Sequence, residues 1–340
     1  MKTLRFAVVG AGFWARFQLA AWRELPGVEC VALCDRVREK AEALARDFQI
    51  RAVYDDTRAL FENEKLDFVD IISDVNTHPR LVEMAAQFGV PVICQKPMAP
   101  SLEAARAMVE TCEAAKTPFW IHENWRFQAP LQALKTELES GVIGEPFRAQ
   151  LKMVSGFPVF ANQPFLRELE QFLIADLGSH IFDVARFLWG EMDSLYCRTQ
   201  RVHRGIAGED CVTAILNARS GVTTVCTLAY AENFLEEDRF PQTFVVVEGS
   251  AGSIEVALDY WVRVTTQSGT FARRVVPPRY PWADPEYDIV HASIVPCNAD
   301  ILADLRGQNV SANRAQQNLK TVELVFAAYD SAARNQVICL

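Results

Sequence analysis

The sequence lacks a long apolar run and a long basic run. No stretch approaches the roughly 18 consecutive apolar residues that cross a membrane, and the first apolar run, residues 6–9, is too short for a signal peptide. Lys and Arg total 34 against 43 Asp and Glu, a formal net charge of −9, which disfavours binding to nucleic acid. We therefore expect a cytoplasmic protein that binds neither a membrane nor a nucleic acid.

Patterns for disulfides and metals are also missing. The nine cysteines are odd in number and contain no C-x-x-C pair, which is typical of reduced thiols buried as small hydrophobic residues. The five histidines include no H-x-x-x-H pair, and no acid-rich ligand loop is present. The sequence therefore predicts no metal site.

What the sequence does contain, over its first third, is an alternation of strands and helices. The predicted strands are Leu4–Val9, Glu29–Cys34, Asp67–Ile72, Val90–Cys94 and Phe119–Ile121, and the predicted helices include Ala41–Phe48, Pro79–Phe88 and Leu102–Ala115. This order is typical of a doubly wound parallel sheet, the Rossmann arrangement. We expect residues 1–122 to form this α/β domain.

The pattern changes after Gln128. A predicted helix over 130–139 precedes strands with period-two faces, such as Cys211, Thr213 and Ile215, and Gly249 and Gly252 form a turn between two further strands. We expect residues 123–340 to form an α+β domain on a largely antiparallel sheet. A final helix over 312–333, with an apolar stripe, should pack on that sheet or on the first domain.

The first predicted strand ends in the sequence GAGFWA. Gly10, Gly12 and Ala15 have the spacing G-x-G-x-x-A, in which the first glycine makes a tight turn, the second admits a pyrophosphate, and the alanine lets the helix pack closely. Phe13 and Trp14 fill the positions between them. Because the motif follows a strand and opens a helix, it predicts a dinucleotide site.

The end of the second strand bears on the choice of dinucleotide. Asp35 lies where an acidic residue bonds the ribose 2′-hydroxyl, which favours NAD. Arg36 and Arg38 follow directly and could instead hold the 2′-phosphate of NADP. A third reading makes Asp35 the N-cap of the next helix.

Two further segments carry reactive side chains. In DLGSHIFD, Asp176, His180 and Asp183 fall on one helical stripe, either as a proton-accepting histidine flanked by carboxylates or as a solvated acidic face. In VPVICQKPMAP, a buried strand delivers Lys96 against Pro97. Lys96 either reaches solvent at the strand end or is held in a site, because a buried ammonium needs partners.

Taken together, these segments resemble the Gfo/Idh/MocA oxidoreductases, two-domain NAD(P)-dependent enzymes that act mostly on sugars and cyclitols. The resemblance covers nearly the whole chain and rests on GAGFWA with Asp35, QKP at 95–97, NWRF at 124–127, DLGSH at 176–180 and VEGSAGSIEV at 247–256. It implies that the first domain binds NAD(P) and the second binds substrate and forms a homodimer or homotetramer. It also implies that Lys96 lies beside the nicotinamide, with His180 as proton acceptor or donor and Asp176 in the same group.

The resemblance implies an activity as well. We expect an NAD-dependent oxidation of a carbinol carbon in a small sugar, an aldose or a cyclitol, by hydride transfer to the nicotinamide. The opening segment and the Gln-Lys-Pro tripeptide resemble family members that oxidise a branched pentose at its anomeric carbon to a lactone. The alternatives are an NAD-dependent glycosidase of the same fold and a regulator that binds NAD without turnover.

The sequence departs from the family pattern at two places. The usual glutamate before the lysine is Gln95 here, which removes a charge although an amide can still hydrogen-bond a ribose hydroxyl. The approach to the Asp-His helix, usually rich in glycine, reads ELEQFLIA over 168–175. We expect the chemistry to survive and the pocket wall to be bulkier.

Several polar residues at the ends of the parallel strands complete the candidate site. Asn124 and Arg126 would either touch substrate or cofactor or stabilise the domain junction. Ser73, Asn76 and His78 belong to the segment SDVNTH, which we expect to contact the cofactor. For His78, capping of this loop is an equal alternative.

Overall fold

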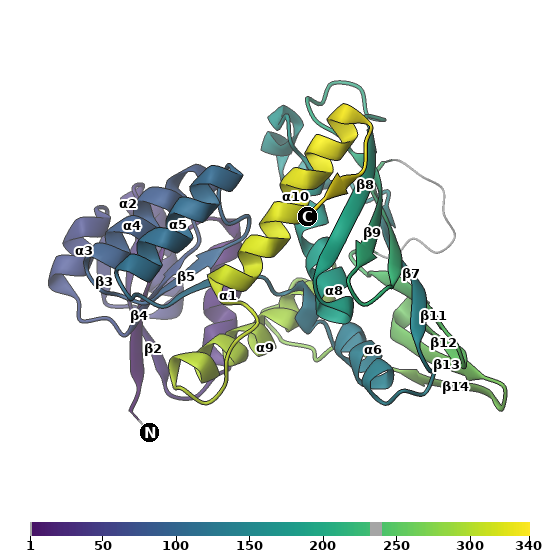
Figure 1. Cartoon of the computed structure of the whole chain (residues 1–340). Helices are drawn as coiled ribbons and strands as arrows, with labels where there is room; N and C mark the ends of the chain where they lie inside the picture. The colour runs from purple at the N-terminus through teal and green to yellow at the C-terminus, as the bar shows by residue number, and fades with distance from the viewer. Residues whose placement is uncertain (1, 232–239) are drawn as a thin grey trace. The chain divides into compact units, whose positions relative to one another are not determined.

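The computed structural model describes residues 2–231 and 240–340. Contacts divide the chain into two units (Figure 1). The first unit comprises Met1–Glu123 and Ile294–Val322, and the second comprises Asn124–Ser293 and Glu323–Leu340. Each unit is described by itself.

The first unit contains a six-stranded parallel sheet with the order β3-β2-β1-β4-β5-β6. Its strands are β1 Leu4–Val9, β2 Val28–Cys34, β3 Ala52–Tyr54, β4 Phe68–Ile71, β5 Val92–Gln95 and β6 Phe119–His122. The strand order reverses between β1 and β4, and ligands of open α/β sheets bind at the carboxyl ends of strands at such a point. The predicted Rossmann sheet is confirmed.

Five helices connect these strands, as the sequence order requires for parallel neighbours. They are α1 Phe13–Arg23, α2 Arg38–Phe48, α3 Thr57–Asn63, α4 His78–Gln87 and α5 Leu102–Ala114. The Ser101 hydroxyl accepts a hydrogen bond from the Ala104 N–H at 3.1 Å and so caps α5 as expected. The three-residue strand β3 and the short helix α3, capped by Asp56, were missed.

Strand β4 is buried on both of its faces. Val69 and Ile71 belong to a large apolar cluster on one side of the sheet. On the other side Phe68 stacks on Phe6, with ring centroids 4.8 Å apart, and also contacts Trp22 of α1. Asp70 is on the same face as Phe68, so a carboxylate lies within an aromatic core.

Residues 294–322 group with the first unit, whereas the sequence boundary placed all of 123–340 in one domain. Helices α9 (Asp288–Leu305) and α10 (Ala315–Arg334) each pass from one unit to the other. Within the first unit the Trp120 indole donates to Asp304 at 2.9 Å, and Arg314 pairs with the same carboxylate. The chain therefore returns to the first unit at residues 294–322 before its last residues, 323–340, rejoin the second.

The second unit is built on a nine-stranded mixed sheet with the order β14-β13-β12-β11-β7-β10-β9-β8-β15, and among these described strands only the β7–β10 pair is parallel. The strands are β7 Pro146–Ser155, β8 Met192–Gln200, β9 Cys211–Ala218, β10 Thr223–Tyr230, β11 Phe244–Gly249, β12 Gly252–Ala257, β13 Trp261–Thr266, β14 Gly269–Arg274 and β15 Ile338–Cys339. The predicted turn joins β11 to β12. The prediction of a largely antiparallel sheet is confirmed.

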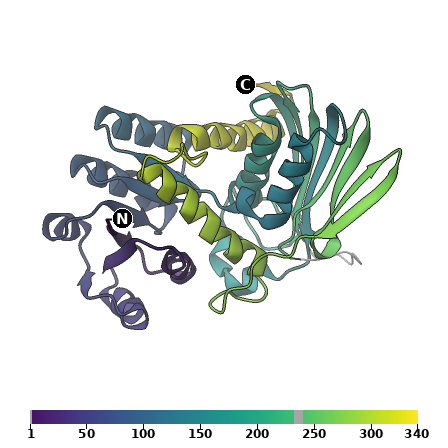
Figure 2. The same ribbon diagram turned by 90° about the horizontal axis from the view of Figure 1, so that it is seen from below.

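Helices cover one face of this sheet. Helices α6 (Ala129–Glu139) and α8 (Ser179–Trp189) lie on the same side of it, as the teal helices of Figure 2 show. The period-two faces expected in β9 are present, and the structure buries the face of Val212 and Leu216 and leaves Ile215 exposed. One face of the sheet in this unit is thus core and the other is open.

Helix α10 has contacts within each unit. Leu319 and Val322 pack against the apolar cluster of the first unit. Tyr329, further along, donates a hydrogen bond to Glu209 in the second unit at 2.9 Å. Over the described part of the chain, none of the helices is both long and apolar enough to span a membrane.

Candidate active site

The glycine-rich turn after β1 fits a dinucleotide phosphate. Gly10 has φ +106°, and a Cβ there would lie 2.2 Å from the Ile72 carbonyl oxygen, so only glycine fits. A Cβ built at Gly12 would meet no described atom within 4 Å, and Gly12 caps α1 without a side-chain hydrogen bond. The helix N-terminus therefore presents backbone N–H groups to open space, as anion binding requires. Ala15 is fully buried, which allows the close packing expected.

Asp35 is tied to the same turn. Its carboxylate accepts hydrogen bonds from the Ala11 N–H at 2.7 Å and from the Val37 N–H at 2.8 Å. The second contact is a local turn rather than a helix cap, because the N-cap of α2 is Val37. Each oxygen still has a lone pair for a ribose hydroxyl. Arg38 lies on the surface and pairs with Glu42 at 2.9 Å, and Arg36 is exposed.

Gln95 and Lys96 lie at the end of β5. The Gln95 side chain is buried, its Oε1 accepts the Lys96 backbone N–H at 2.7 Å, and its Nε2 donates to Gln18 Oε1 at 2.8 Å. Lys96 is half-buried, and its bond to Pro97 is cis. Gln95 therefore holds the lysine backbone, a role that its sequence position did not reveal.

His78 connects the loops that follow β4 and β5. Its Nδ1 lies 3.1 Å from the Pro97 carbonyl oxygen and 3.2 Å from that of Met98, and its Nε2 lies 3.1 Å from that of Ser73. Burial lowers the pKa of the ring, although the hydrogen bonds to the three carbonyl oxygens oppose this shift. The loop-holding alternative therefore accounts for its contacts.

The other two residues predicted in this segment differ in exposure. Ser73 is half-buried and shares a 2.7 Å hydrogen bond with the Thr77 hydroxyl, whereas the Asn76 side chain is exposed and donates to Asp74 at 2.9 Å. Both lie in the loop at the carboxyl end of β4, the edge of the sheet where ligands of this fold bind.

In the second unit, Asp176 lies in a π-turn over Ile174–Gly178, and His180 follows in the first turn of α8. We expected a regular helix here. A π-turn inserts an extra residue, and such turns are frequent at functional sites. His180 is 5% exposed, and its ring stacks on the Trp125 indole with centroids 4.4 Å apart. The stacking fixes the plane of the imidazole.

Glu209 holds the backbone that enters the π-turn. Its Oε1 accepts the Ile174 N–H at 2.9 Å and the Tyr329 hydroxyl at 2.9 Å, and its Oε2 accepts the Phe172 N–H at 3.3 Å. The Tyr329 oxygen in turn accepts the Ala175 N–H at 3.1 Å. Sequence reasoning missed Glu209, since it lies more than thirty positions from the residues it holds.

The charge of Asp176 acts on a buried tyrosine, Tyr230. Burial raises the pKa of Tyr230 on β10, and the negative charge of Asp176 raises it further, so the phenol stays neutral. Tyr230 also contacts Phe240, with ring centroids 6.2 Å apart, and Phe240 contacts Tyr287. This aromatic group was not identified from the sequence.

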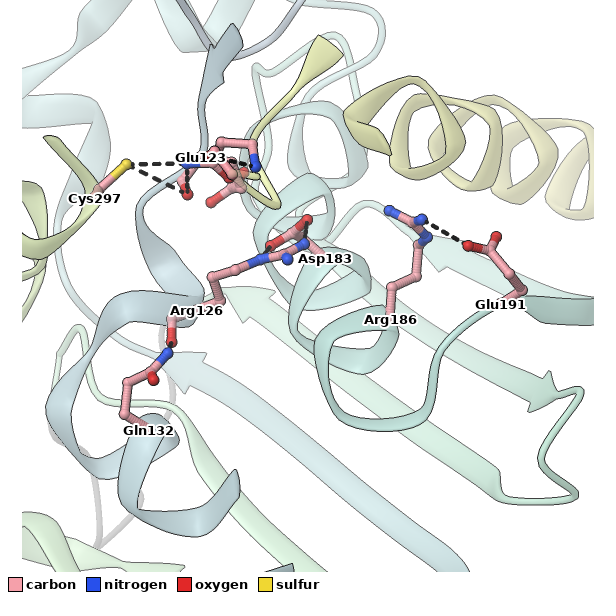
Figure 3. Close-up of polar contacts among 9 residues, drawn as sticks. Glu123, Arg126, Gln132, Asp183, Arg186, Glu191 and Cys297 are labelled. Atoms are coloured by element: carbon pink, nitrogen blue, oxygen red, sulfur yellow. Dashed lines mark hydrogen bonds and ion pairs between the residues drawn. The ribbon is translucent and has the colours of Figure 1, made fainter. Parts of the chain in front are cut away.

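Asp183 does not flank His180 as a free carboxylate. It forms a buried two-point ion pair with Arg126, whose Nε lies 2.6 Å from Oδ2 and whose Nη2 contacts Oδ1 (Figure 3). Asn124 is likewise buried and donates to the Val290 carbonyl and the Ser293 hydroxyl. These contacts all lie within the second unit, so ligand contact and stabilisation of the domain junction both stay predictions for the two residues.

The remaining histidines have structural hydrogen bonds. His122 lies 2.9 Å from Asn298, His203 lies 2.7 Å from Asp210, and His291 accepts the Asp284 N–H while burial lowers its pKa to about 4. His180 differs from them in its position, at the start of α8 directly after the π-turn that contains Asp176. Predicted site residues thus form two sets, one in each unit.

Comparisons with known proteins agree with this arrangement. A model described as "Oxidoreductase family, NAD-binding Rossmann fold" matches residues 4–123, and one described as "GFO/IDH/MocA C-terminal domain" matches residues 131–255. D-apiose dehydrogenase of Paraburkholderia graminis is 41% identical over 99% of this chain and 90% of its own. That of Rhizobium rhizogenes is 40% identical over 99% and 98%.

A solved structure is similar throughout. An oxidoreductase from Agrobacterium radiobacter, in complex with NAD+, L-tartaric acid and magnesium, superposes with a TM-score of 0.97 at 40% identity, covering 99% of this chain and 98% of that one. Levoglucosan dehydrogenase, with a TM-score of 0.85 at 18% identity, shares the fold. The phosphate-binding turn, the parallel sheet and these matches agree: the chain belongs to the Gfo/Idh/MocA family of NAD-dependent oxidoreductases.

Proposed function

We propose that this protein oxidises D-apiose, or an aldose very close to it, at the anomeric carbon to give the lactone. The observation that carries this proposal is the 40–41% identity to two D-apiose dehydrogenases over 99% of the chain. The retention of Lys96 and His180 supports catalysis rather than a regulatory role, because each supplies chemistry that a non-catalytic protein does not need.

The proposed roles follow from the side chains. NAD supplies the hydride acceptor when bound, and the turn at Gly10 and Gly12 would hold its phosphates while Asp35 bonds the ribose. His180 accepts the proton of the substrate hydroxyl, and Asp176 orients His180. Lys96 donates a hydrogen bond to the same oxygen and stabilises negative charge that develops on it. Gln95, Ser73 and Asn76 contribute to the cofactor side, and His78 holds their loops.

The test is a substrate panel. Purified enzyme is incubated with NAD and D-apiose, other aldoses, cyclitols and alkyl glycosides, and NADH absorbance and sugar products are followed. We expect D-apiose to give the highest kcat/KM and a lactone product. Preference for a cyclitol would contradict the substrate, and glycoside cleavage without net NADH would indicate the glycosidase alternative.

We also propose that copies associate through the open face of the nine-stranded sheet. Register places Ile215, Val225, Gln150 and Val246 in one row across β9, β10, β7 and β11, and three of the four are apolar and at least partly exposed. Light scattering should show a dimer or tetramer, and Ile215→Lys should shift it toward monomer. A monomeric wild type would contradict this.

A further inference from the structure

A carboxylate is buried in the first unit without a cation. Asp70 on β4 is fully buried, and among the described residues no lysine, arginine or histidine forms an ion pair with it. Its two oxygens accept the Gln18 side-chain amide at 2.8 and 2.9 Å, and Oδ2 also accepts the Trp22 indole N–H at 2.7 Å. Burying a carboxylate in this way is costly, so its retention calls for a reason.

The Gln18 amide continues toward the candidate site. Gln18 Oε1 accepts the Gln95 amide at 2.8 Å, and Gln95 Oε1 accepts the Lys96 backbone N–H at 2.7 Å. We call the side chains of Gln18 and Gln95 the amide relay. Asp70 lies 52 positions from Gln18 in the sequence, and Gln95 lies 77 positions from it, so the fold alone brings the three side chains together.

The relay has a single direction. An ionised carboxylate only accepts hydrogen bonds, so Gln18 must turn its NH₂ toward Asp70 and its carbonyl toward Gln95. Gln95 must then turn its NH₂ toward Gln18 and its carbonyl toward the Lys96 N–H. We propose that ionised Asp70 is a positioning residue that orients Gln95 through Gln18 and so fixes the backbone from which Lys96 projects.

Ionisation of Asp70 is therefore the variable on which this orientation depends. Burial raises the pKa of Asp70 to about 7, although the Trp22 and Gln18 hydrogen bonds oppose the rise. The titratable groups near it are the thiols of Cys30 on β2 and Cys94 on β5, and burial raises the pKa of both, so they stay neutral. A proton on Asp70 would need an acceptor, which Gln18 can provide only by reversing its amide.

The same logic explains why position 95 is a glutamine here. The substitution Gln95→Glu would place a second acceptor against Gln18 Oε1 while Asp70 holds the Gln18 NH₂. When Asp70→Asn is added, Gln18 could reverse, accept from the introduced asparagine amide and donate to the introduced glutamate, which would still accept the Lys96 N–H. In the native pair and in the doubly exchanged pair, every donor at positions 70, 18 and 95 faces an acceptor. Either single change places two donors or two acceptors against each other.

The first test needs neither substrate nor NAD. Lysine-selective ¹⁵N labelling gives few amide signals, and Lys96→Arg identifies that of Lys96 by its loss. We expect the wild-type Lys96 amide shift to titrate with a midpoint near pH 7, the pKa of Asp70, and this titration to vanish in Asp70→Asn. A titration unchanged in that variant would overturn the proposal. His78, which contacts the same loop, titrates at lower pH because burial lowers its pKa.

The second test exchanges the two residues and rests on the proposed function for its assay. Asp70→Asn and Gln95→Glu should each lower kcat by at least about tenfold, roughly 1.4 kcal/mol, and the double variant should return to within about threefold of wild type. Additive losses would overturn the relay. If a single variant does not fold, recovery of thermal stability in the double variant provides the same reading.

Phe68→Leu is the matched control, because it lies two residues from Asp70 on the same buried face and takes no part in the relay. It should lower the melting temperature but leave both kcat and the Lys96 amide titration unchanged. If this control loses as much kcat as Asp70→Asn does, then Asp70 only stabilises the fold, and the proposed positioning role is wrong. Absence of turnover on every sugar would contradict the proposed function, while the amide titration would still decide the relay.

Discussion

Two buried carboxylates hold the two segments that carry the proposed catalytic residues, and they do so differently. Glu209 binds directly to the backbone at Phe172 and Ile174, at the start of the π-turn that precedes His180. Asp70 is separated from Lys96 by two side-chain amides. The segment before His180 is thus held by a direct anchor, a carboxylate bonded to its backbone, whereas the Lys96 segment is held through the amide relay.

The two arrangements differ in whether the direction of their hydrogen bonds can be reversed. Backbone N–H groups cannot change into acceptors, so the contacts of Glu209 have one possible direction. Side-chain amides can rotate by half a turn, so the direction of the amide relay is set by the groups at its two ends, the Lys96 backbone N–H and the Asp70 carboxylate. Of these two groups, only Asp70 can change between acceptor and donor, by taking up a proton. The Lys96 side should therefore respond to protonation of a distant group, whereas the His180 side should not.

The largest effect is expected at His180. His180→Ala removes the proposed base, so the chemical step should slow by about 10²- to 10⁴-fold. Residual activity should rise with pH as hydroxide replaces the base, and NAD should still bind because the glycine turn is unchanged. Pre-steady-state NADH formation against pH measures this. Near-normal turnover would remove His180 from the role of base.

Lys96→Met should have the next largest effect. The substitution keeps length but deletes the charge and donors, so transition-state stabilisation of about 3 kcal/mol should be lost. No new rise with pH is expected, which separates a hydrogen-bond donor from a base. Lys116→Met, an exposed lysine of the same unit, is the control and should behave as wild type. A base-like pH profile in Lys96→Met would exchange the two roles.

Local signals in the sequence were sufficient for most of the first unit. Short apolar runs predicted β1, β2, β4, β5 and β6, and the spacing of Gly10, Gly12 and Ala15 predicted the turn that the structure contains. Strand β3 was missed because its apolar run is only three residues long and only partly buried. The family was identifiable because its motifs are local and ordered.

The contacts among the candidate site residues could not be predicted from the sequence. The ion pair between Arg126 and Asp183 joins positions 57 apart, and the amide relay joins β4, α1 and β5. The π-turn was invisible because hydrophobic periodicity does not distinguish it from a regular helical turn. Such pairings depend on tertiary packing, for which a single sequence has no local signal.

Cofactor choice should show a moderate effect. Asp35 lies where a 2′-phosphate would meet like charge, so NAD should exceed NADP in kcat/KM by at least about tenfold, or 1.4 kcal/mol. Asp35→Ser should reduce that ratio toward one. A wild-type preference for NADP, lost in Arg38→Ala, would instead assign the selectivity to Arg38. Asp35 contacts neither Asp70 nor Glu209, so this test shows how large an effect on kcat/KM a single cofactor contact in the first unit has.

The smallest effect is expected at Tyr329, and it tests the comparison most directly. Tyr329→Phe deletes the hydroxyl that donates to Glu209 and accepts the Ala175 N–H, leaving that partly buried N–H without its acceptor at a cost of about 1 kcal/mol. The melting temperature should fall by a few degrees, but kcat should drop by less than about fivefold because Glu209 keeps both backbone contacts.

The pH profile decides between the two kinds of anchor. Burial, with the nearby Glu209 charge, raises the pKa of Tyr329 far above neutrality, so the phenol is a neutral donor throughout the working range. Tyr329→Phe should therefore scale the wild-type pH profile without shifting it, whereas Asp70→Asn should change the profile near pH 7. Tyr196→Phe, which removes an exposed hydroxyl bonded to Asn335, is the control and should change neither quantity. If Tyr329→Phe shifts the profile instead, the His180 segment depends on a titrating group as the Lys96 segment does, and the distinction between direct anchor and relay fails.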